Sequence, residues 1–346
     1  MIKYTIKRLI LAFITTFIIL SLTFILMKLL PFTKPIGTDG LKFAYYNKQV
    51  FLGYCVDVAE KNDALGDLLW YYKEEAAKTS HYYYQTPIMT QYFRWLGNIV
   101  TKWDWGTSTS VLLNAEAIYI IGERIPVSMT LNILSVVFSV PLGITLGIIA
   151  ALKKNKPTDN IISTAVMIFI SIPGFVLITF AILILCYRLQ WLPTQWPKPT
   201  DPTSWKILGY IIPVFVLSFG SVCGYCRSVR AELCEVMESE YLLLARTKGL
   251  TKRQSIIRHA LRNAMVPIVP SILGEFIGVL GGSMILETLY GIPGIGSLFV
   301  EALNGKDYNV LFVDMALFTT IGLVAGVFLD LSYGLIDPRI RMGAKK

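Results

Sequence analysis

Six long apolar stretches determine the solvent in which this chain can fold. A helix that crosses the roughly 30 Å hydrocarbon core of a bilayer needs about 20 mostly apolar residues. Stretches of that length run approximately over residues 9–30, 127–152, 161–187, 207–226, 265–289 and 310–335. A soluble domain carries about 25% charged residues, whereas this chain of 346 residues has 16%. The sequence therefore predicts an all-α membrane protein with six transmembrane helices.

The first stretch follows Lys3, Lys7 and Arg8, as the apolar part of a secretory signal peptide would. Its apolar part is longer than the roughly 7 to 15 residues of a signal peptide, and no small-residue cleavage site follows it. We therefore expect a retained transmembrane helix within residues 1–31.

Basic residues near the ends of the stretches predict the orientation, because cytoplasmic segments carry an excess of Lys and Arg. If the N-terminus is cytoplasmic, the segments on that side hold 18 Lys and Arg against six Asp and Glu. Residues 31–125, on the opposite side, hold nine basic and ten acidic residues. The net charge of +9 is thus explained by membrane orientation instead of nucleic acid binding, and both termini are predicted to be cytoplasmic.

Residues 32–125 form an insertion between the first two predicted helices that is too long for a plain connector. It is rich in aromatic residues, with the runs WYY at 70–72 and YYY at 82–84. One interpretation is a small helical cap whose Trp and Tyr rings lie at the level of the lipid headgroups. The other is a surface that contacts a partner or substrate outside the membrane. His81 is predicted to be a surface residue because no second His, Cys or spaced carboxylate pair accompanies it.

Small and kink-forming residues recur within the apolar stretches, among them Gly143, Gly147, Pro173 and Pro213. Membrane helices use small residues for close contact and tolerate proline kinks. Close helix packing is the favoured interpretation, and movement around a pathway at the proline kinks is the alternative. The pair Cys223 and Cys226 forms a CxxC without a second pair, which favours a structural position over a redox or metal site.

The most informative segment is the predicted cytoplasmic loop, residues 227–263. Its first half reads as a helix continuing from the fourth stretch and ending near Lys248, with Gly249 in a left-handed terminating position. Thr251 and Gln254 then form a capping-box pattern that opens a second helix. That helix places Ile256, Ile257, Ala260 and Leu261 on one side, suited either to the inner leaflet or to a groove on a soluble partner.

At these residues the chain resembles the permease subunits of bacterial binding-protein-dependent importers driven by ATP, in the oligopeptide, dipeptide and nickel group. The segment ARTKGLTKRQSIIRHALRNAMVPIVP, residues 245–270, is similar to that group's cytoplasmic loop signature. Leu243 and Leu244 depart from the generic Glu and Ala there. Further resemblance is carried by GERIPVSMTLNIL at 122–134, ETLYGIPGIGSLFVEALNGKDY at 287–308 and LDLSYGLIDPRIRMG at 329–343.

The resemblance implies a type I importer permease fold, with a five-helix core over residues 126–338 and a basic cytoplasmic tail at 339–346. It implies a second homologous permease, two cytoplasmic ATPase subunits and an extracytoplasmic peptide-binding protein as partners, in a bacterial cell membrane. The short helix after Gly249 would couple this chain to one ATPase. The implied coupling residues are Ala245, Lys248, Gly249, Leu250, Thr251, Arg253, Gln254, Ile257, Arg258 and His259.

ATP and magnesium are expected on the partner ATPase chains, because no G-x-x-x-x-G-K-[ST] occurs in this sequence. No catalytic, cofactor-binding or metal-ligating residue is predicted, and neither HExxH nor GxSxG is present. Nickel chelate and glutathione are alternative cargoes within the same class.

An ion-coupled secondary transporter is the rival from another class, since it would use intramembrane carboxylates. Glu287, Asp314 and Asp330 lie near the ends of their stretches. Only Glu275 is predicted to lie deep in the membrane, where it is a candidate polar site or a structural partner between subunits.

Overall fold

The computed structural model describes residues 2–75, 77–278 and 282–336, so the predicted tail at 339–346 lies outside the described residues. The chain divides into two compact units. The unit called here the sheet unit consists of Ile6–Pro126 and Leu298–Thr320, and the helical unit is built mainly from Val127–Ser297 and from residues after 320. Four helices contribute residues to both units: α1 (Ile2–Leu29), α4 (Ala117–Leu152), α14 (Ile295–Asn304) and α15 (Tyr308–Ile336).

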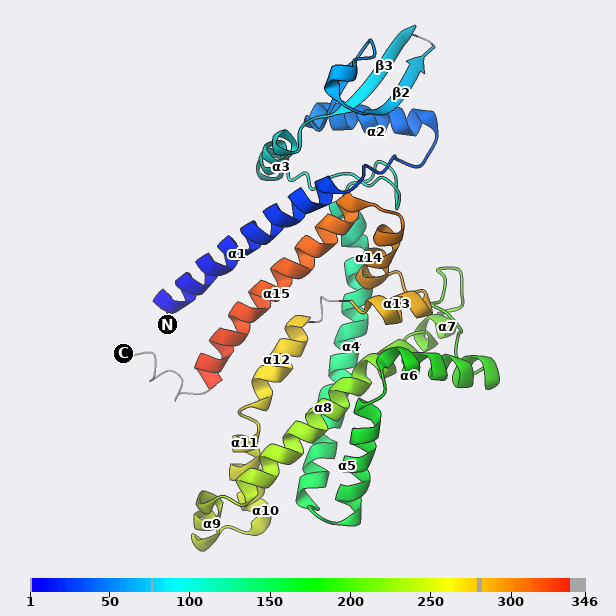
Figure 1. The fold of residues 1–346 in the computed structure, drawn as a ribbon. Helices are drawn as coiled ribbons and strands as arrows, with labels where there is room; N and C mark the ends of the chain where they lie inside the picture. Colours follow the sequence, from blue (N-terminus) through cyan, green and yellow to red (C-terminus); the bar gives the residue numbers. More distant parts are fainter. Residues whose placement is uncertain (1, 76, 279–281, 337–346) are drawn as a thin grey trace. The chain divides into compact units, whose positions relative to one another are not determined.

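The sheet unit carries a three-stranded antiparallel sheet in the order β1-β3-β2. In the register of the longer pair, Trp70 lies opposite Tyr83 and Tyr72 lies opposite His81. Helix α2 runs along one face of this sheet (Figure 1). Its elements are α1 (Ile2–Leu29), α2 (Asp39–Leu52), β1 (Cys55–Val58), a 3-10 turn (Asp63–Leu65), β2 (Leu68–Glu74), β3 (Thr79–Gln85), α3 (Ile88–Lys102), the start of α4 (Ala117–Leu152), most of α14 (Ile295–Asn304) and the start of α15 (Tyr308–Ile336).

Stacked aromatic rings fill the space between α2 and the sheet. The ring of Tyr46 stacks on Trp70 and Tyr83, with centroids 5.2 and 4.9 Å away. Tyr46 and Tyr83 are both fully buried. Stacking of this kind adds to the large apolar area that each ring buries, so these rings form the core between α2 and the sheet.

The expectation of an all-α chain with a helical cap is therefore wrong for residues 55–85. The aromatic runs at 70–72 and 82–84 form β2 and β3, because aromatic side chains fit a pleated, half-buried surface. Tyr83 and Tyr84 are buried in the unit itself, not exposed to headgroups or a partner. His81 Nδ1 donates a hydrogen bond to Asp57 Oδ2 at 2.7 Å, and a quarter or less of each side chain is exposed.

The helical unit contains no strand among its described residues. Its helices follow one another with short connections, apart from the loop between α6 and α7 (Figure 1). They are most of α4, α5 (Pro157–Ile170), α6 (Gly174–Ala181) with its π-helical extension (Ile182–Arg188), α7 (Thr203–Leu208), α8 (Ile211–Met237), α9 (Glu240–Thr247), α10 (Lys252–Ser255), a second π-helical segment (Ile256–Ala260), α11 (Leu261–Ala264), α12 (Ile268–Gly278), α13 (Met284–Tyr290) and the end of α15.

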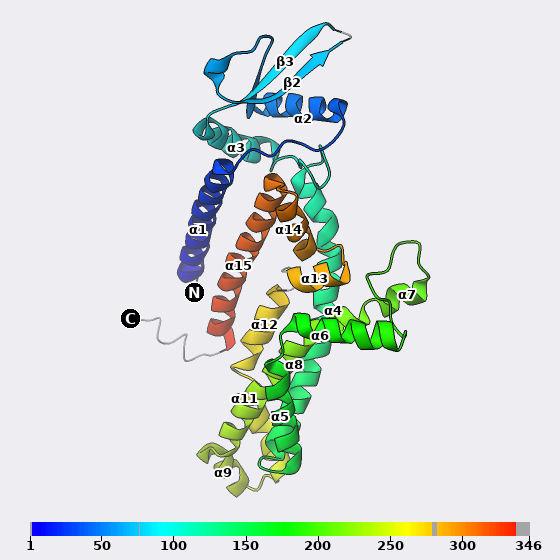
Figure 2. The same ribbon diagram turned by 45° about the vertical axis from the view of Figure 1, so that its right-hand side comes forward.

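The third predicted stretch is a broken element, not one straight helix. Helix α5 ends at Ile170, and α6 begins after Pro173 at an angle of 98° to it (Figure 2). Proline lacks the N–H that would continue the helix and clashes with the preceding turn. The proline that the sequence marked as a kink thus separates two helices. Pro213 instead lies in the first turn of α8, where its missing N–H interrupts no helical hydrogen bond.

Four helices in the described part of the chain are long and apolar enough to cross a membrane, and the α5–α6 pair makes a fifth if it is one broken span. The four are Thr5–Leu29, Ala117–Leu152, Thr203–Met237 and Tyr308–Ser332. The predicted span at 265–289 corresponds to the shorter helices α12 and α13, and residues 279–281 between them lie outside the described residues. A multi-pass helical membrane protein is confirmed, and six spans stay a prediction.

Helices α4 and α8 approach so closely that two glycines of α4 have no room for a side chain. A Cβ atom on Gly147 would lie 2.7 Å from Cβ of Val229 and 2.8 Å from the carbonyl oxygen of Cys226. A Cβ atom on Gly143 would lie 2.9 Å from the carbonyl oxygen of Val222. The close-packing interpretation is confirmed at both glycines, as small residues in membrane helices allow.

Candidate functional site

The predicted cytoplasmic loop turns sharply at Gly249. The φ angle of Gly249 is +92°, and its N–H donates to the carbonyl oxygen of Arg246 at 3.0 Å, which ends α9. Only glycine adopts such a backbone without strain. Thr251 and Gln254 then form the predicted capping box: Gln254 N–H donates to Thr251 Oγ1 at 3.3 Å, and Thr251 N–H donates to Gln254 Oε1 at 3.1 Å. The predicted glycine turn, followed by a capped second helix, is confirmed.

Two details of this loop differ from the sequence prediction. The chain does not continue as one helix from α8 to Lys248, because α8 ends at Met237 and α9 begins at Glu240. In the second helix the buried positions are Ser255, Ala260 and Ala264, while Ile257 is 56% exposed. The π-helical segment over Ile256–Ala260 adds a residue to its turn, which takes Ile257 away from the face that a regular helix would bury.

Leu243, Leu244 and Ile257 are the most exposed of the large apolar side chains in the described part of the loop, and we call these three the loop patch. They are 63%, 57% and 56% exposed. Exposed apolar groups bordered by polar residues are typical of protein interaction sites. Among the predicted coupling residues, Ala245 and Leu250 are partly buried, whereas Lys248, Gly249, Thr251, Arg253, Gln254, Ile257, Arg258 and His259 are exposed.

The loop is anchored to the rest of the helical unit by small buried residues. Ala260 and Ala264 pack with Leu233 of α8, Leu242 of α9 and Ala151 of α4 in one apolar cluster. A displacement of the loop patch would therefore move residues that contact α4 and α8. Such packing would pass a displacement of the loop on to α4 and α8, because close-packed interiors have low compressibility and transmit strain.

An ion pair with a buried carboxylate, near this loop, was not identified from the sequence. Arg230 of α8 donates from Nε and Nη2 to both carboxylate oxygens of Asp159 in α5, at 2.6 and 2.8 Å. Asp159 is 1% exposed and also accepts from Asn155 N–H and Ser163 Oγ. Bidentate pairing fixes geometry as well as energy, so it ties α5 to α8. The two residues are 71 positions apart in the sequence, so no local pattern predicts that they pair.

Glu275, the candidate intramembrane site, lies on α12 and accepts a hydrogen bond from the Tyr225 hydroxyl of α8. Its partner is thus within the same chain. Both residues line a cavity of about 340 Å³ in the helical unit. Its other lining residues are Ser221, Gly224, Ser228, Glu232, Pro267, Ile268 and Ser271.

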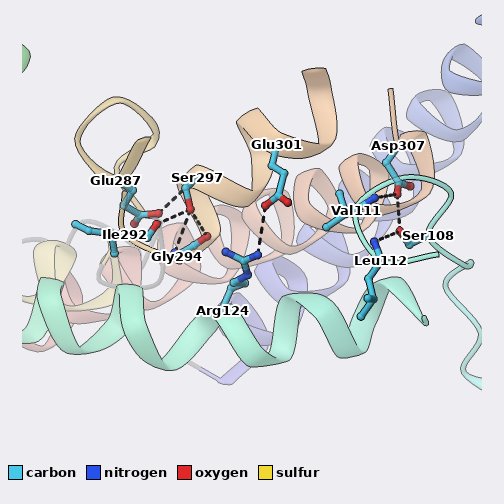
Figure 3. A network of polar contacts seen from close by, with 10 residues as sticks. All are labelled: Ser108, Val111, Leu112, Arg124, Glu287, Ile292, Gly294, Ser297, Glu301 and Asp307. Carbon is cyan, nitrogen blue, oxygen red and sulfur yellow. Dashed lines mark hydrogen bonds and ion pairs between the residues drawn. The ribbon is translucent and has the colours of Figure 1, made fainter. Parts of the chain in front are cut away.

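Glu287, one of the carboxylates that an ion-coupled transporter would need, holds a loop together. It is 2% exposed, and its carboxylate accepts from Ser128 Oγ at 2.9 Å, Ser283 N–H at 3.2 Å and Ser297 N–H at 3.0 Å. A Cβ atom on Gly294 would lie 2.4 Å from Glu287 Oε2, which explains a glycine there. Figure 3 shows Glu287 directed at the loop after α13. Asp314 is buried and Asp330 is partly buried.

In the sheet unit a second buried carboxylate likewise accepts several hydrogen bonds from one loop. Asp307 is fully buried, and its Oδ2 accepts from Ser108 Oγ at 2.6 Å and from the N–H groups of Thr109, Ser110 and Val111 at 2.9, 2.9 and 3.1 Å. Figure 3 shows Asp307 with Ser108 and Val111. We call this arrangement the Asp307 clasp. The sequence carried a partial signal, because an Asp directly before an apolar helix is a typical N-cap. Its four distant donors could not be read from spacing.

The CxxC pair is part of the packing between α5 and α8. Cys223 and Cys226 are buried free thiols that cluster with Val166. Both side chains contribute to the packing of these two helices, and the absence of a redox or metal role stays a prediction.

Comparisons with known proteins are consistent with this geometry. The sequence model of the family described as "Binding-protein-dependent transport system inner membrane component" matches residues 143–342. The oligopeptide transport system permease protein OppB of Haemophilus influenzae is 30% identical over 342 residues, covering 99% of this chain and 100% of the relative. The dipeptide transport system permease protein DppB of Lactococcus lactis is 31% identical over 347 residues, again covering 99% and 100%.

Among solved structures, a chain of an amino acid ABC transporter with histidines superposes with a TM-score of 0.51. The match covers 62% of this chain and 94% of that chain, at 16% identity. Similarity at this level shows a shared fold and carries no statement about cargo.

Proposed function

The chain belongs to the family of binding-protein-dependent transport system inner membrane components, and on that premise we propose that it is the transmembrane pathway subunit of an ATP-driven importer of oligopeptides or dipeptides. The assignment of oligopeptides or dipeptides as the cargo rests on the end-to-end similarity to permeases named for oligopeptide and dipeptide transport. The chain is a transport subunit of the cell membrane and not an enzyme, and ATP hydrolysis takes place on partner ATPases.

Coupling to the ATPase is assigned to the loop between α8 and α12. The loop patch of Leu243, Leu244 and Ile257 supplies exposed apolar area, and Arg253 and Arg258 supply exposed charge beside it. An apolar centre with a charged rim suits a groove on a soluble protein. Closure of two ATPase subunits would push this loop, and its packed residues would pass the displacement to α4 and α8.

The assembly that follows contains this chain, a second homologous permease, two cytoplasmic ATPases and an extracytoplasmic binding protein. The proposed topology has six spans, with α12 and α13 contributing the fifth, and both termini in the cytoplasm. Support comes from the basic residues, eight of which lie in residues 227–263, on the side predicted to be cytoplasmic. The boundaries 1–31, 32–125, 126–338 and 339–346 stay predictions.

An ion-coupled transporter is disfavoured by the use that the structure makes of its carboxylates. Glu287 is saturated by three donors, and Glu275 is bonded to Tyr225. A carboxylate that already accepts structural hydrogen bonds has fewer acceptor sites left for an ion. Glu275 is proposed to be a structural partner of Tyr225 beside the polar cavity.

The proposed function is tested by reconstituting the full assembly in liposomes and measuring uptake of a labelled oligopeptide. Uptake is expected to require ATP and both ATPases, and the purified chain alone is expected to hydrolyse no ATP. An excess of unlabelled dipeptide or oligopeptide should compete, whereas glutathione and a nickel chelate should not.

Uptake by the lone chain in an imposed proton or sodium gradient would contradict the proposal and support the ion-coupled alternative. Competition by glutathione or nickel chelate but not by peptide would keep the importer class and change the cargo. Glu275→Gln, which removes the charge but keeps a hydrogen-bond acceptor, should leave ATP-dependent uptake within about threefold of wild type.

A further inference from the structure

A small, partly open cavity lies in the sheet unit, at the end of α1. Its volume is about 60 Å³, enough for several water molecules or one small ionic group. The last turns of α1, helices α2 and α3, the loop around Trp105 and the start of α15 supply its walls. The polar lining groups used below are those of Lys28, Trp95, Trp105, Thr109 and Lys306.

Three hydrogen-bond donors lining this cavity have no partner among the described residues. They are the indole N–H groups of Trp95 and Trp105 and the hydroxyl of Thr109. Trp95 and Thr109 are only 4% and 6% exposed. A buried donor without an acceptor costs roughly 1–3 kcal/mol, so native structures rarely leave such groups unpaired. Three of them at one cavity make it suited to a group that carries acceptor atoms.

The charge of the lining is positive. The ammonium group of Lys28 lies 5.6 Å from the ring centroids of both Phe24 and Tyr54, and no carboxylate of the described chain lies within ion-pairing distance of it. Lys306 also borders the cavity, and none of the lining residues is Asp or Glu.

Neighbouring groups do not cancel this charge. The nearby Asp307 is not a lining residue, and its Oδ2 already accepts from four donors. Burial raises the pKa of Tyr54 to about 12, and burial likewise raises that of Tyr45. Both phenols therefore stay neutral at physiological pH and add no negative charge.

We propose that this cavity binds an oxyanion, and that its source is the phosphate group of a membrane phospholipid. Ammonium and indole donors around a small, partly open cavity suit phosphate oxygens, which form strong charge-assisted hydrogen bonds. The helix that leads to the cavity offers the apolar surface that acyl chains need: Leu22, Leu26 and Leu29 of α1 are 58%, 55% and 64% exposed. The lipid would hold the end of α1 against the start of α15.

The test uses the full chain, purified and delipidated in detergent, with binding followed by native mass spectrometry. Phosphatidylglycerol is the probe, and diacylglycerol and inorganic phosphate are the comparison ligands. Phosphatidylglycerol is expected to bind, diacylglycerol to bind at least about tenfold more weakly, and phosphate at equal concentration not to displace the lipid. Displacement by phosphate would show a free-anion site and overturn the lipid assignment.

Variants locate the bound lipid. Lys28→Gln should weaken phosphatidylglycerol binding about tenfold, Lys28→Arg should restore it, and Trp95→Phe, which keeps a ring but removes the N–H, should weaken it about threefold or more. Lys34→Gln, an exposed lysine that does not line the cavity, is the matched control and should bind like wild type. Equal binding by wild type, Lys28→Gln and Trp95→Phe would overturn the proposal. Because no transport is measured, the result is independent of the cargo.

Discussion

Gly249→Pro is expected to reduce ATP-dependent peptide uptake to less than about a tenth of wild type while the chain still inserts into the membrane. The φ angle at this position is +92°, and proline is restricted to about −65°. An incompatible proline costs about 3 kcal/mol or more, which lowers the population of the native loop more than a hundredfold. The spans themselves are untouched by this change, so insertion should persist.

A graded series at the same position separates backbone geometry from side-chain size. A Cβ atom on Gly249 would meet no described atom within 4 Å, so any loss comes from the backbone. Gly249→Asn should retain most of the uptake, because Asn tolerates a left-handed backbone. Gly249→Ala should be intermediate, at a cost of about 1–2 kcal/mol. Uptake that is equal in the Asn, Ala and Pro variants would show that the turn does not participate in coupling.

Asp307→Ala is expected to destabilise the sheet unit by about 3 kcal/mol or more, because it leaves one hydroxyl and three backbone N–H groups without their acceptor. For a unit of this size the midpoint of thermal unfolding should fall by roughly 6 °C or more. Tryptophan fluorescence during heating in detergent measures it, since Trp95 lies in this unit.

The matched control is Asp39→Ala in the same unit. Asp39 forms an ion pair with Lys42 at 3.6 Å, and 71% of its side chain is exposed; such pairs contribute about 0–1 kcal/mol. If Asp307→Ala and Asp39→Ala unfold at the same temperature, the clasp does not stabilise the loop at 108–111. Asp307→Asn should fall between them, because its amide keeps one acceptor oxygen but points a donor at other donors.

The loop between α8 and α12 was the part of the site that the sequence predicted best. Gly249 and the Thr251–Gln254 pair act through contacts within four residues, so spacing alone was sufficient to place them. The face of the second helix was predicted wrongly at Ile257, because the periodicity argument assumed 3.6 residues per turn and the chain forms a π-helical segment there.

The sheet was missed for a different reason. Residues 70–72 and 82–84 are consecutive aromatics, so they lack the alternation of apolar and polar residues that normally marks a strand. In the structure both faces of β3 are covered at Tyr83 and Tyr84, and continuous apolar runs are typical of strands buried on both sides.

Interactions between distant residues could not be predicted at all. The Asp159–Arg230 pair and the Asp307 clasp join residues separated by 71 and by about 200 positions, and no single sequence encodes such pairings locally. The sequence showed only that Glu287 is near the end of its stretch, and its burial and its hydrogen bonds from Ser128 and Ser297 emerged only from the fold. Length and hydropathy therefore fixed the membrane class, and tertiary contacts decided the role of each carboxylate.

The most direct test of the central claim is the accessibility of one cysteine in the loop patch. All five native cysteines are buried, so Ile257→Cys adds a single exposed thiol at a position that is 56% exposed. A membrane-impermeant maleimide should label it in inside-out vesicles but not in right-side-out vesicles, and bound ATPase subunits should protect it. Labelling from the outside, or labelling that is unchanged by the ATPases, would contradict the account.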